Sequence, residues 1–305
     1  MTLVHLRAFC SVVDKGSFRA AARQLGVAQS TLTQSIQSLE KELGVTLLAR
    51  TNQGINLTPA GDSFLIRARS ITLDCDRALQ DVQQWKGEPE GQIALGVTSE
   101  PLAELLMPVF SSFTQRFPKV QVHVASGAAK GLIEKIRDGR LDFAMCPLAS
   151  NVSDIDLAIE RLYSSEASII ARKGHPHADA RTVRELTDCQ WISVRPAGVV
   201  GGAENRLIEL FKAERLPPPK IAITADSLLE TLHIVSESDY LTIEPRMLPS
   251  MKLFSSSLIA IPIREPLASR NVCLISRRAS PFTPITQELT SMLISYSRLI
   301  HRPTA

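Results

Sequence analysis

The chain contains 305 residues, of which 44% are hydrophobic and 21% are charged. A chain of this length and composition can form two or three domains with buried cores. Its net charge of +3 is only a weak indication of nucleic-acid binding. Residues 1–69, however, carry eight lysines and arginines against four aspartates and glutamates, so the positive charge gathers where phosphate contacts would need it.

The five cysteines stand at positions 10, 75, 146, 189 and 273, without CxxC or CxxH spacing. This argues against a secreted disulfide framework and against a zinc site. Buried structural thiols are the favoured interpretation, and redox sensing is the alternative. Residues 1–13 lack a signal-peptide pattern, and no window approaches 18 apolar residues. We therefore expect a cytoplasmic protein with no membrane association, no metal and no cofactor.

Two short helices joined by a tight turn are predicted near the N-terminus. Ser17 can cap the first helix, and Gly26 can end it in the left-handed conformation. Its inward face is expected to be Ala20, Ala21 and Leu25. The second helix has one apolar stripe at spacings of four and three, formed by Leu32, Ile36, Leu39 and Leu43.

The second helix carries uncharged hydrogen-bonding side chains away from this stripe: Gln29, Ser30, Thr31, Thr33, Gln34, Gln37 and Ser38. Hydroxyls and amides can bond base edges and phosphate oxygens in the major groove of DNA. An acidic residue there would repel phosphate, and none precedes Glu40 in this helix. The alternative is that these are solvated positions on two ordinary surface helices.

The flanking segments favour the DNA-binding interpretation. An upstream amphipathic helix is predicted from Leu3, Leu6, Phe9, Cys10 and Val13. Downstream, residues 47–58 predict two short strands around the turn at Gly54. Three helices followed by a hairpin predict a winged helix-turn-helix.

The N-terminal residues resemble the LysR-type transcriptional regulator family. The resemblance is carried by Phe9, Ser17–Phe18, Ala20–Ala22, Leu25, Val27, Gln29–Ser30, Leu32–Thr33, Ile36, Leu39–Glu40, Leu43–Gly44, Leu47–Leu48, Arg50 and Leu57–Gly61. It implies a DNA-binding domain over residues 1–58, in which Gln29, Ser30, Thr31, Thr33 and Gln34 enter the major groove, with Ser17 at the start of the preceding helix. It places Arg50, Asn52 and Gln53 near the DNA backbone or minor groove. The sequence departs from many relatives at Gln34, Gln37 and Ser38, where they carry basic residues.

A long helix is predicted next, capped by Thr58 with Pro59 at its first position. Its apolar residues recur at alternating spacings of four and three: Phe64, Ala68, Ile71, Cys75, Ala78, Val82 and Trp85. Such heptads predict a seam with another helix, and the chain has no second long heptad helix, so pairing of two copies is favoured. The alternative is that the stripe packs on a domain of its own chain. We assign residues 59–88 to this linker helix, followed by a hinge.

From residue 92 the pattern alternates between strand and helix. Strands are predicted at 92–98, 120–125 and 141–146, then at 167–171, 191–194, 221–225, 240–243, 258–263 and 272–276. Helices are predicted at 102–117, 131–137, 203–215, 227–235 and 283–299. This order predicts parallel strands in a doubly wound sheet. The family resemblance implies a two-lobed α/β effector domain of periplasmic-binding-protein-like fold over residues 89–305. Lobe I would comprise about 89–161 and 268–305 and lobe II about 162–267, with crossings near Arg161 and Leu267.

A cleft between two α/β lobes is a common ligand site, because strand ends and helix starts point polar groups into it. Thr98 and Ser99 end the first strand and start a helix, so they suit an anionic group, although Ser99 alternatively only caps the helix. By resemblance the inducer pocket is lined by Thr98, Ser99, Ser126, Cys146, Pro147, Ser193, Arg195, Ser227 and Thr242. Arg195 would pair with a carboxylate or sulfonate, or else lie on the surface. Glu100 and Glu244 at the same cleft would oppose an anion.

An enzyme with a DNA-binding appendage is the rival class. The sequence contains no GxSxG, HExxH or GxxxxGK[ST] motif and no GxGxxG after a strand, so no catalytic residues are assigned. The close histidine pair, His175 and His177, is interpreted as a solvent-exposed turn rather than a metal site.

The favoured function is a homo-oligomeric transcription factor that responds to a small molecule. Two recognition helices would read a pseudo-palindrome of duplex DNA with half-sites about one turn apart. Dimers would form along the linker helix, a tetramer is implied by the family, and RNA polymerase is a further candidate partner. The inducer would be a small organic acid, and residues 238–246 resemble a branch linked with aromatic compounds. The alternative is a constitutive repressor whose α/β half serves only assembly.

Overall fold

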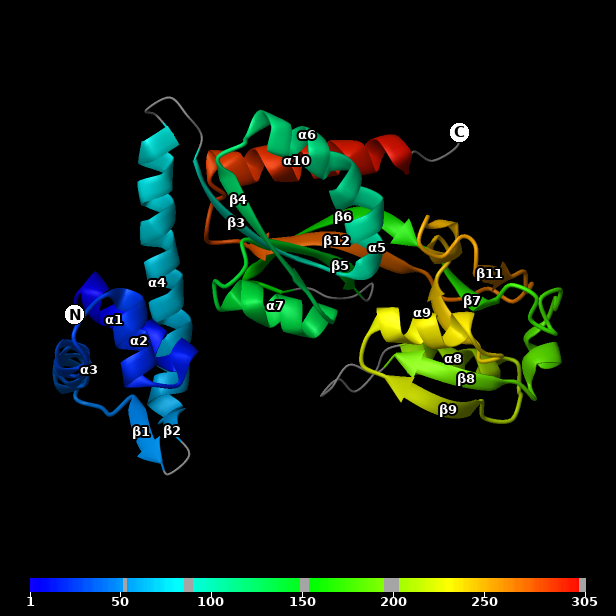
Figure 1. The fold of residues 1–305 in the computed structure, drawn as a ribbon, viewed down its shortest axis with the longest axis horizontal. Coiled ribbons are helices and arrows are strands. Elements are labelled where there is room, and N and C mark those ends of the chain that lie inside the picture. The colour runs from blue at the N-terminus through cyan, green and yellow to red at the C-terminus, as the bar shows by residue number, and fades with distance from the viewer. Residues whose placement is uncertain (52–53, 85–89, 149–153, 195–202, 302–305) are drawn as a thin grey trace.

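The computed structural model describes residues 1–51, 54–84, 90–148, 154–194 and 203–301. Three parts follow one another along its longest axis: a small helical domain with a hairpin, a central lobe and a second lobe (Figure 1). The long helix α4 stands between the first part and the central lobe.

The N-terminal domain consists of α1 (Leu3–Lys15), α2 (Phe18–Leu25), α3 (Gln29–Leu43), β1 (Leu48–Thr51) and β2 (Gly54–Leu57). Ser17 caps α2, since its Oγ accepts a hydrogen bond from the Ala20 amide at 3.4 Å. Gly26 ends α2 with a φ of 66°, as predicted. The hairpin is antiparallel, with Leu48 opposite Leu57. The predicted winged helix-turn-helix is confirmed.

The core of this domain joins α1, α2, α3 and the hairpin through Leu6, Phe9, Val12, Ala21, Ala22, Leu32, Ile36, Leu39, Leu47 and Leu48. Two residues predicted to face inward do not. Leu25 is 37% exposed and Leu43 is 36% exposed. Each stands in the last turn of its helix, directly before a left-handed glycine, where the helix already extends past the core.

Helix α4 (Pro59–Gln84) begins where the sequence predicts. Thr58 Oγ1 accepts a hydrogen bond from the Gly61 amide at 3.0 Å and donates one to the Thr46 carbonyl at 2.7 Å. Pro59 occupies the first helical position, where a missing amide hydrogen costs nothing. The cap therefore fixes both the start of α4 and its direction relative to the hairpin.

The predicted seam of α4 is divided between two environments. Phe64 and Ala68 pack into the core of the N-terminal domain, and the Phe64 ring meets Phe9 edge-on with centroids 5.4 Å apart. For these two residues, the alternative of packing on their own chain is correct. Trp85 lies outside the described residues. The other seam positions are exposed or half-buried: Ile71, Cys75, Ala78 and Val82.

The central lobe is built on a five-stranded sheet in the order β4-β3-β5-β12-β6. Its strands are β3 (Gly91–Val97), β4 (Val120–Ser126), β5 (Phe143–Leu148), β6 (Leu157–Ser165) and β12 (Arg270–Arg277). β3 runs parallel to β4 and β5, but β12 runs antiparallel to β5 and β6. The predicted parallel sheet is thus corrected to a mixed one, because the chain returns from the second lobe into β12. The pattern does not predict β6, because Glu160 and Arg161 interrupt its apolar residues.

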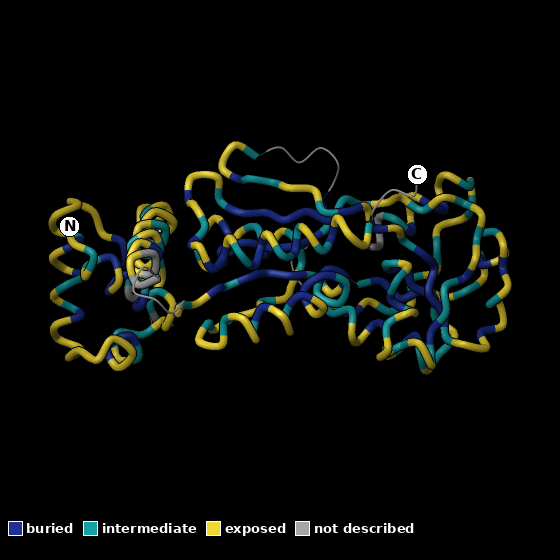
Figure 2. Tube along the Cα trace, turned by 90° about the horizontal axis from the view of Figure 1, so that it is seen from above, coloured by how far each residue is buried: buried dark blue, intermediate teal, exposed yellow. Residues whose placement is uncertain are grey.

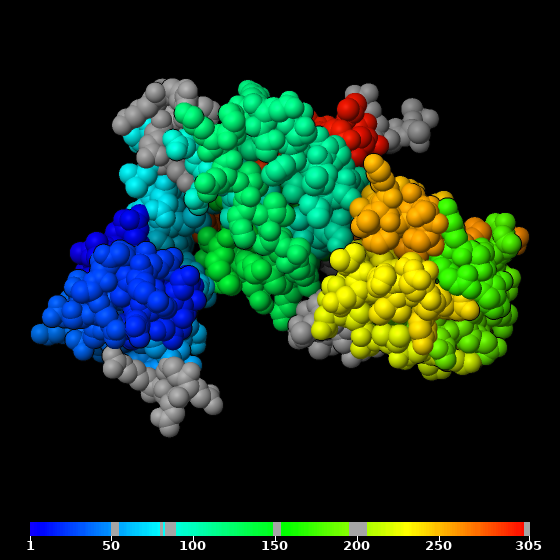
Figure 3. Space-filling view, viewed as in Figure 1, coloured from blue at the N-terminus to red at the C-terminus, as the bar shows by residue number. Residues whose placement is uncertain are grey.

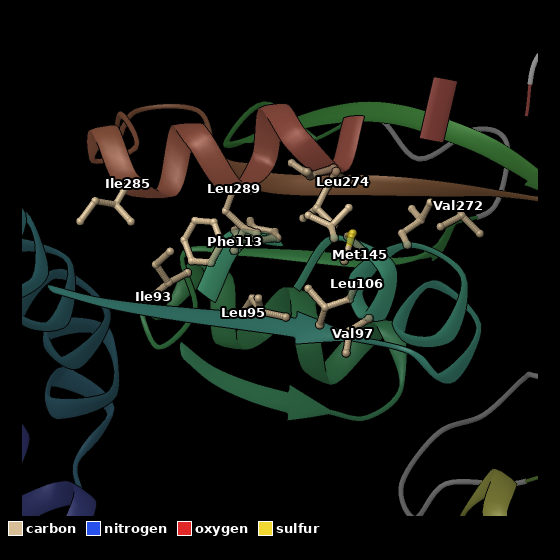
Figure 4. Packing of buried hydrophobic residues seen from close by; sticks show 14 of the residues in the cluster. Ile93, Leu95, Val97, Leu106, Phe113, Met145, Val272, Leu274, Ile285 and Leu289 are labelled. Atoms are coloured by element: carbon tan, nitrogen blue, oxygen red, sulfur yellow. The ribbon is translucent and has the colours of Figure 1, made fainter. Parts of the chain in front are cut away.

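Helices cover both faces of this sheet. On one face lie α6 (Met107–Arg116) and α10 (Pro284–Ile300), and on the other lies α7 (Ala129–Arg137) (Figure 1). Figure 4 shows Leu289 of α10 and Phe113 of α6 packed near the sheet residues Ile93 and Leu274. The predicted helix at 102–117 is preceded by α5 (Ser99–Pro101) and contains the π-helical turn η1 (Leu102–Leu106).

The second lobe contains two small sheets. One has the order β10-β7-β11 and is formed by β7 (Ala167–Arg172), β10 (Thr242–Pro245) and β11 (Leu258–Ile261), all antiparallel. The other pairs β8 (Gln190–Val194) with β9 (Lys220–Ala225) in parallel. The remaining elements are α8 (Ala203–Ala213), α9 (Leu228–Ser236), η2 (Val183–Leu186) and η3 (Leu248–Ser250). The buried segments of both lobes are visible along the trace in Figure 2.

The chain passes between the lobes twice. It leaves the central lobe at Glu166, between β6 and β7, and returns between β11 and β12. The predicted first crossing near Arg161 is corrected, because β6 stays paired with β12 as far as Ser165. The return segment includes Leu267, where the sequence predicts the second crossing.

A buried ionic contact joins α4 to the central lobe. Arg77 is only 7% exposed, and its Nη2 lies 2.5 Å from Asp142 Oδ1. Its Nη1 donates a hydrogen bond to Ser280 Oγ. Asp142 Oδ2 accepts a hydrogen bond from the Ala94 amide at 2.7 Å, which ties the ion pair to β3. The middle of α4 is therefore fastened to the sheet of the central lobe.

Candidate nucleic-acid interface and ligand cavity

Helix α3 divides into a buried and an exposed face. Leu32, Ile36 and Leu39 are buried against α1 and α2. Most of the predicted polar contact positions are exposed, and Thr33 is half-buried: Gln29, Ser30, Thr31, Thr33 and Gln34. This exposed strip carries no charge, because the side chains that point outward are hydroxyls and amides.

Two hydrogen-bonding details define what α3 can offer to a partner. Thr33 Oγ1 donates to the Gln29 carbonyl at 2.9 Å, so its hydroxyl keeps lone pairs, but not its hydrogen, for other partners. Ala28 occupies the N-cap position without a side-chain hydrogen bond, so the first amides of α3 have no side-chain cap. Ser17, by contrast, is half-buried and uses its Oγ as the cap of α2.

Glu40 connects α3 to the hairpin. Its Oε1 accepts hydrogen bonds from the amides of Leu47 and Leu48, at 2.7 and 3.1 Å. The start of the hairpin is therefore tied to the C-terminal half of α3. Arg50 lies on β1 opposite Ile55, and Asn52 and Gln53 lie outside the described residues.

A cavity of about 330 Å³ lies between the two lobes, which meet along one boundary in the space-filling view (Figure 3). The central lobe contributes Val97, Thr98, Ser99, Glu100, Ser126, Gly127, Ala128, Pro147 and Ser165 to its wall. The second lobe contributes Val194, Arg206, Asp226, Ser227, Leu228, Glu244 and Pro245, and Arg270 stands at the start of β12.

The structure brings together many of the residues predicted for the cleft: Thr98, Ser99, Glu100, Ser126, Pro147 and Ser227. The expected position of Cys146 is corrected. Cys146 is fully buried in the core under α7, because neighbouring residues of a strand point to opposite faces and Pro147 takes the cavity side. Ser193 and Thr242 are buried beside the cavity and do not line it. Arg195 lies outside the described residues.

The start of α5 settles the local role of Ser99. Thr98 occupies the N-cap position, and Ser99 is the first helical residue, so the alternative that Ser99 only caps the helix is wrong. The Thr98 hydroxyl makes no capping hydrogen bond and is buried without a partner in the described part of the chain. Both side chains belong to the cavity wall.

Two buried carboxylates face the cavity from opposite lobes. Glu100 is 6% exposed and accepts a hydrogen bond from Ser165 Oγ at 2.7 Å. Burial raises its pKa to about 7, although the Ser165 hydrogen bond lowers it. Glu244 is 7% exposed, and burial raises its pKa to about 7 against the lowering effect of Arg206 and Arg270. The sequence places both glutamates at the cleft but gives no indication of their burial.

Two arginines of the cavity are absent from the sequence-based prediction. Arg206 of α8 is half-buried, and burial lowers its pKa. Arg270 precedes the apolar run of β12. Neither residue stands in a recognisable motif, and each reaches the cavity only through the packing of distant segments. Their place at the cavity depends on tertiary structure, so it cannot be predicted from the local sequence.

His175 and Cys146 are both buried inside the fold. His175 is 4% exposed, which corrects the predicted exposed turn. Its Nδ1 accepts a hydrogen bond from the His177 amide at 3.0 Å, so its Nε2 is the nitrogen that donates to the Asp239 carbonyl at 3.1 Å. Burial raises the pKa of Cys146 to about 12, which makes a reactive thiolate unfavourable.

Neither a metal cluster nor a membrane span is found in the ranges that the structure describes. No three His, Cys, Asp or Glu side chains are grouped there as metal ligands would be. Every helix in those ranges is too short or too polar to cross a lipid bilayer.

Two family models match the chain. The model described as "Bacterial regulatory helix-turn-helix protein, lysR family" matches residues 3–62, and "LysR substrate binding domain" matches residues 86–297. The chain belongs to the LysR family of transcriptional regulators. Members of this family are transcriptional regulators rather than enzymes.

This LysR-type regulator is similar to characterised relatives over most of its length. It is 30% identical to the HTH-type transcriptional regulator TdcA of Escherichia coli (strain K12) over 263 residues, which cover 86% of this chain and 83% of TdcA. It is 28% identical to the transcriptional dual regulator GltC of Bacillus subtilis (strain 168), with 97% of each chain covered.

Solved structures share its fold. The LysR family transcriptional regulator CbnR superposes with a TM-score of 0.69 at 20% identity, covering 97% of this chain and 99% of CbnR. A full-length OxyR variant from Pseudomonas aeruginosa gives a TM-score of 0.71 at 21% identity, covering 99% of this chain and 97% of OxyR. CbnR has also been solved in complex with its target DNA, and that structure gives a TM-score of 0.68.

Proposed function

We propose that this regulator binds an operator in duplex DNA through α3 of two paired chains, under the control of a small organic acid held between the lobes. We assign residues 1–58 to DNA binding, 59–88 to the linker and 89–305 to the effector domain. The exposed, uncharged strip of α3 carries this proposal. It suits contacts with base edges, whose major-groove pattern distinguishes all four base pairs.

The surroundings of α3 support the same role. The uncapped amides at its start are available to a phosphate oxygen. Arg19 and Arg23 of α2 are both exposed nearby, so they add positive charge for phosphate contacts. The hairpin beside α3, held by Glu40, would place Arg50, Asn52 and Gln53 along the DNA backbone or minor groove.

Ser30→Glu tests the DNA-binding strip. The substitution places a negative charge on the exposed face without disturbing the core, and we expect affinity for the regulator's own promoter to fall at least 100-fold because a carboxylate repels phosphate. Fluorescence anisotropy with a promoter fragment measures this. Ser111→Glu, at an exposed position of α6, adds the same charge elsewhere and should bind as the wild type. If the Ser30 variant binds the promoter fragment with wild-type affinity, the assignment of α3 to the DNA interface is wrong.

The effector part of the proposal rests on the cavity between the lobes. Its volume of about 330 Å³ is at the lower end of the range for small-molecule sites. Both lobes contribute polar side chains to it, so a bound molecule would favour one lobe arrangement by its difference in affinity. Regulation requires only that this molecule binds, without any chemical conversion. We place the regulator in the cytoplasm, where the DNA lies.

A thermal-shift screen of small organic acids, aromatic ones included, tests the effector. We expect at least one acid to raise the melting temperature and to change the affinity for promoter DNA. A complete absence of hits, with DNA binding intact, would favour a constitutive repressor whose α/β half serves only assembly. Conversion of an acid during incubation, detected by mass spectrometry, would instead indicate an enzyme.

A further inference from the structure

The cavity between the lobes is lined by both acidic and basic side chains. Glu100 enters it from the central lobe and Glu244 from the second lobe, and both are more than nine-tenths buried. Arg206 and Arg270 line the same wall. Buried charges are rare in proteins unless a partner compensates them.

Glu244 lacks such a partner in the described part of the chain. Its Oε1 is buried without a hydrogen bond. Within the described ranges, no ion pair joins Glu244 or Glu100 to Arg206 or Arg270. Ser165 satisfies one oxygen of Glu100, but a hydroxyl supplies no positive charge. Among the described residues, the two carboxylates therefore have no cation in direct contact.

Arg206 lacks a hydrogen-bond acceptor in the described ranges, just as Glu244 lacks a donor. Its Nε is buried without a hydrogen-bond partner in the same ranges. The buried hydroxyl of Thr98 in the wall is also unpartnered there. Leaving a buried donor or acceptor unsatisfied costs about 1–3 kcal/mol, and more for a charged group. A ligand that satisfies these groups must supply both donors and acceptors.

A simple anion fits only half of this wall. Its carboxylate would be attracted to Arg206 and Arg270 but repelled by Glu100 and Glu244, in a buried site where charges interact strongly. A simple cation has the opposite difficulty. A molecule with an ammonium group at one end and a carboxylate at the other satisfies both pairs.

We propose that the effector is a small zwitterion of amino-acid type. Its ammonium group would bind Glu100 and Glu244, and its carboxylate would bind Arg206, with Arg270 adding positive charge. The cavity volume corresponds to roughly ten water molecules at about 30 Å³ each, so it suits a molecule of about ten non-hydrogen atoms. This inference rests on the proposed role of the cleft as the effector site.

The positions of the two glutamates would let one ligand link the two lobes. They come from different lobes, so one ammonium group between them would connect α5 to β10. Without that group, the Glu100 carboxylate raises the pKa of Glu244 and so opposes its ionisation. A zwitterion would therefore favour the arrangement in which the lobes lie close together.

Calorimetry with three matched series tests the proposal. The first series is the neutral L-amino acids from L-alanine to L-phenylalanine, the second is the 2-hydroxy acids with the same skeletons, from L-lactate to L-3-phenyllactate, and the third is the corresponding amines, from ethylamine to phenethylamine. We expect at least one amino acid to bind, and its hydroxy acid and amine to bind at least tenfold more weakly.

Two substitutions identify the carboxylates. Glu244→Gln should weaken binding of the amino acid at least tenfold and should not weaken binding of the matched hydroxy acid, whose carboxylate Glu244 no longer repels. Glu100→Gln should have the same effect. It replaces the first variant in the test if Glu244→Gln does not melt cooperatively and is therefore not properly folded. Glu166→Gln is the matched control, because its side chain is 69% exposed and lies outside the cavity. Unchanged amino-acid affinity in both cavity variants would overturn the proposal.

The outcomes separate this inference from the function on which it rests. Equal binding of an amino acid and its hydroxy acid would overturn the zwitterion but keep the cleft as an organic-acid site. Binding of organic acids alone, with no amino acid bound, would do the same. If neither these series nor the wider acid screen gives any binding, the proposed effector role fails together with the inference.

Discussion

Gly61 stands at the contact between the start of α4 and the strand that precedes it. A Cβ at this position would overlap the Leu47 carbonyl oxygen and would approach the Leu57 side chain to 3.0 Å. The same carbonyl accepts a hydrogen bond from the Thr58 amide at 3.0 Å, so it cannot move away without breaking the cap of α4. The absence of a side chain at Gly61 therefore sets how closely α4 can pack on the hairpin.

Gly61→Ala should consequently destabilise the N-terminal domain by about 2 kcal/mol or more, because backbone atoms must shift to relieve the overlap. Gly131→Ala is the matched control, since a Cβ there has open space around it and the residue lies in α7. Alanine should leave that helix unchanged or slightly more stable. Urea denaturation followed by circular dichroism measures both, and equal stabilities of the two variants would contradict this assignment.

The cavity glutamates predict an unusual dependence of stability on pH. Burial raises the pKa of Glu100 and Glu244 from 4.5 to about 7, although Arg206 lowers both values and Arg270 lowers that of Glu244. The folded chain then holds protons that the unfolded chain releases between pH 4.5 and 7. Their stabilising contribution is thus complete below pH 4.5 and is lost as the pH rises through 7.

Without any small molecule, the melting temperature of the effector domain should therefore fall between pH 5 and 8. Each residue contributes on the order of 1–3 kcal/mol to this change. The double variant Glu100→Gln and Glu244→Gln should flatten the profile, because glutamine does not titrate. Glu166→Gln should retain the wild-type slope. Scanning fluorimetry across this range measures it, and parallel profiles for all three proteins would exclude these two carboxylates as its source.

At the scale of the elements, one buried arginine is central to the contact between α4 and the central lobe, to which Arg69, Ser70 and Asp74 add further polar contacts. Arg77 bonds Asp142 and Ser280, and Asp142 is in turn bonded to the backbone of β3. Removing one member of a buried ion pair leaves the other charge uncompensated, which typically costs about 3–5 kcal/mol.

Arg77→Met should therefore lower the melting temperature of the effector domain and make the residues after α4 more accessible to protease. Arg298→Met provides the control, because Arg298 is 74% exposed and pairs with Glu160 at the surface, where such pairs contribute less than about 1 kcal/mol. Limited proteolysis and thermal melting report the two effects. If both variants behave alike, the buried contact does not hold α4 against the lobe.

The elements also show how far the sequence predicts this molecule. Helix ends follow local chemistry, so the cap at Ser17, the stop at Gly26 and the start at Pro59 are where the pattern places them. The direction of β12 is not predictable in this way, because it depends on the chain returning from a second lobe. For the same reason Arg206 escapes prediction at the cavity, whereas Thr98 follows directly from its strand end.

At the scale of the whole molecule, the exposed half of the α4 seam is the surface that predicts self-association. Ile71 and Val82 are 42% and 60% exposed, on the stripe that Cys75 and Ala78 share. Exposed apolar stripes of this kind commonly mark protein interfaces. Phe64 and Ala68 are already buried in their own domain, so a partner chain would meet only the later part of the helix.

Replacing Ile71 and Val82 together by aspartate should give monomers that bind promoter DNA at least tenfold more weakly, because one chain then reads one half-site. Light scattering coupled to size-exclusion chromatography measures the mass. Leu253→Asp, at a residue 69% exposed in the second lobe, should leave the mass unchanged. An unaltered oligomer in the double variant would place the self-association surface elsewhere.

Helix α4 packs in the N-terminal core through Phe64 and Ala68 and contacts the central lobe through Arg69, Asp74 and Arg77. Arg77, the buried member of these contacts, lies about 27 Å from the start of the helix, at 1.5 Å per residue over the 18 residues from Pro59. A tilt of α4 by about 5° around Arg77 would displace the N-terminal domain by roughly 2 Å. Hydrogen bonds tolerate only a few tenths of an ångström, so this displacement is enough to misalign them. A small movement of the lobes that tilts α4 would therefore be enough to change how the DNA-binding domain meets DNA.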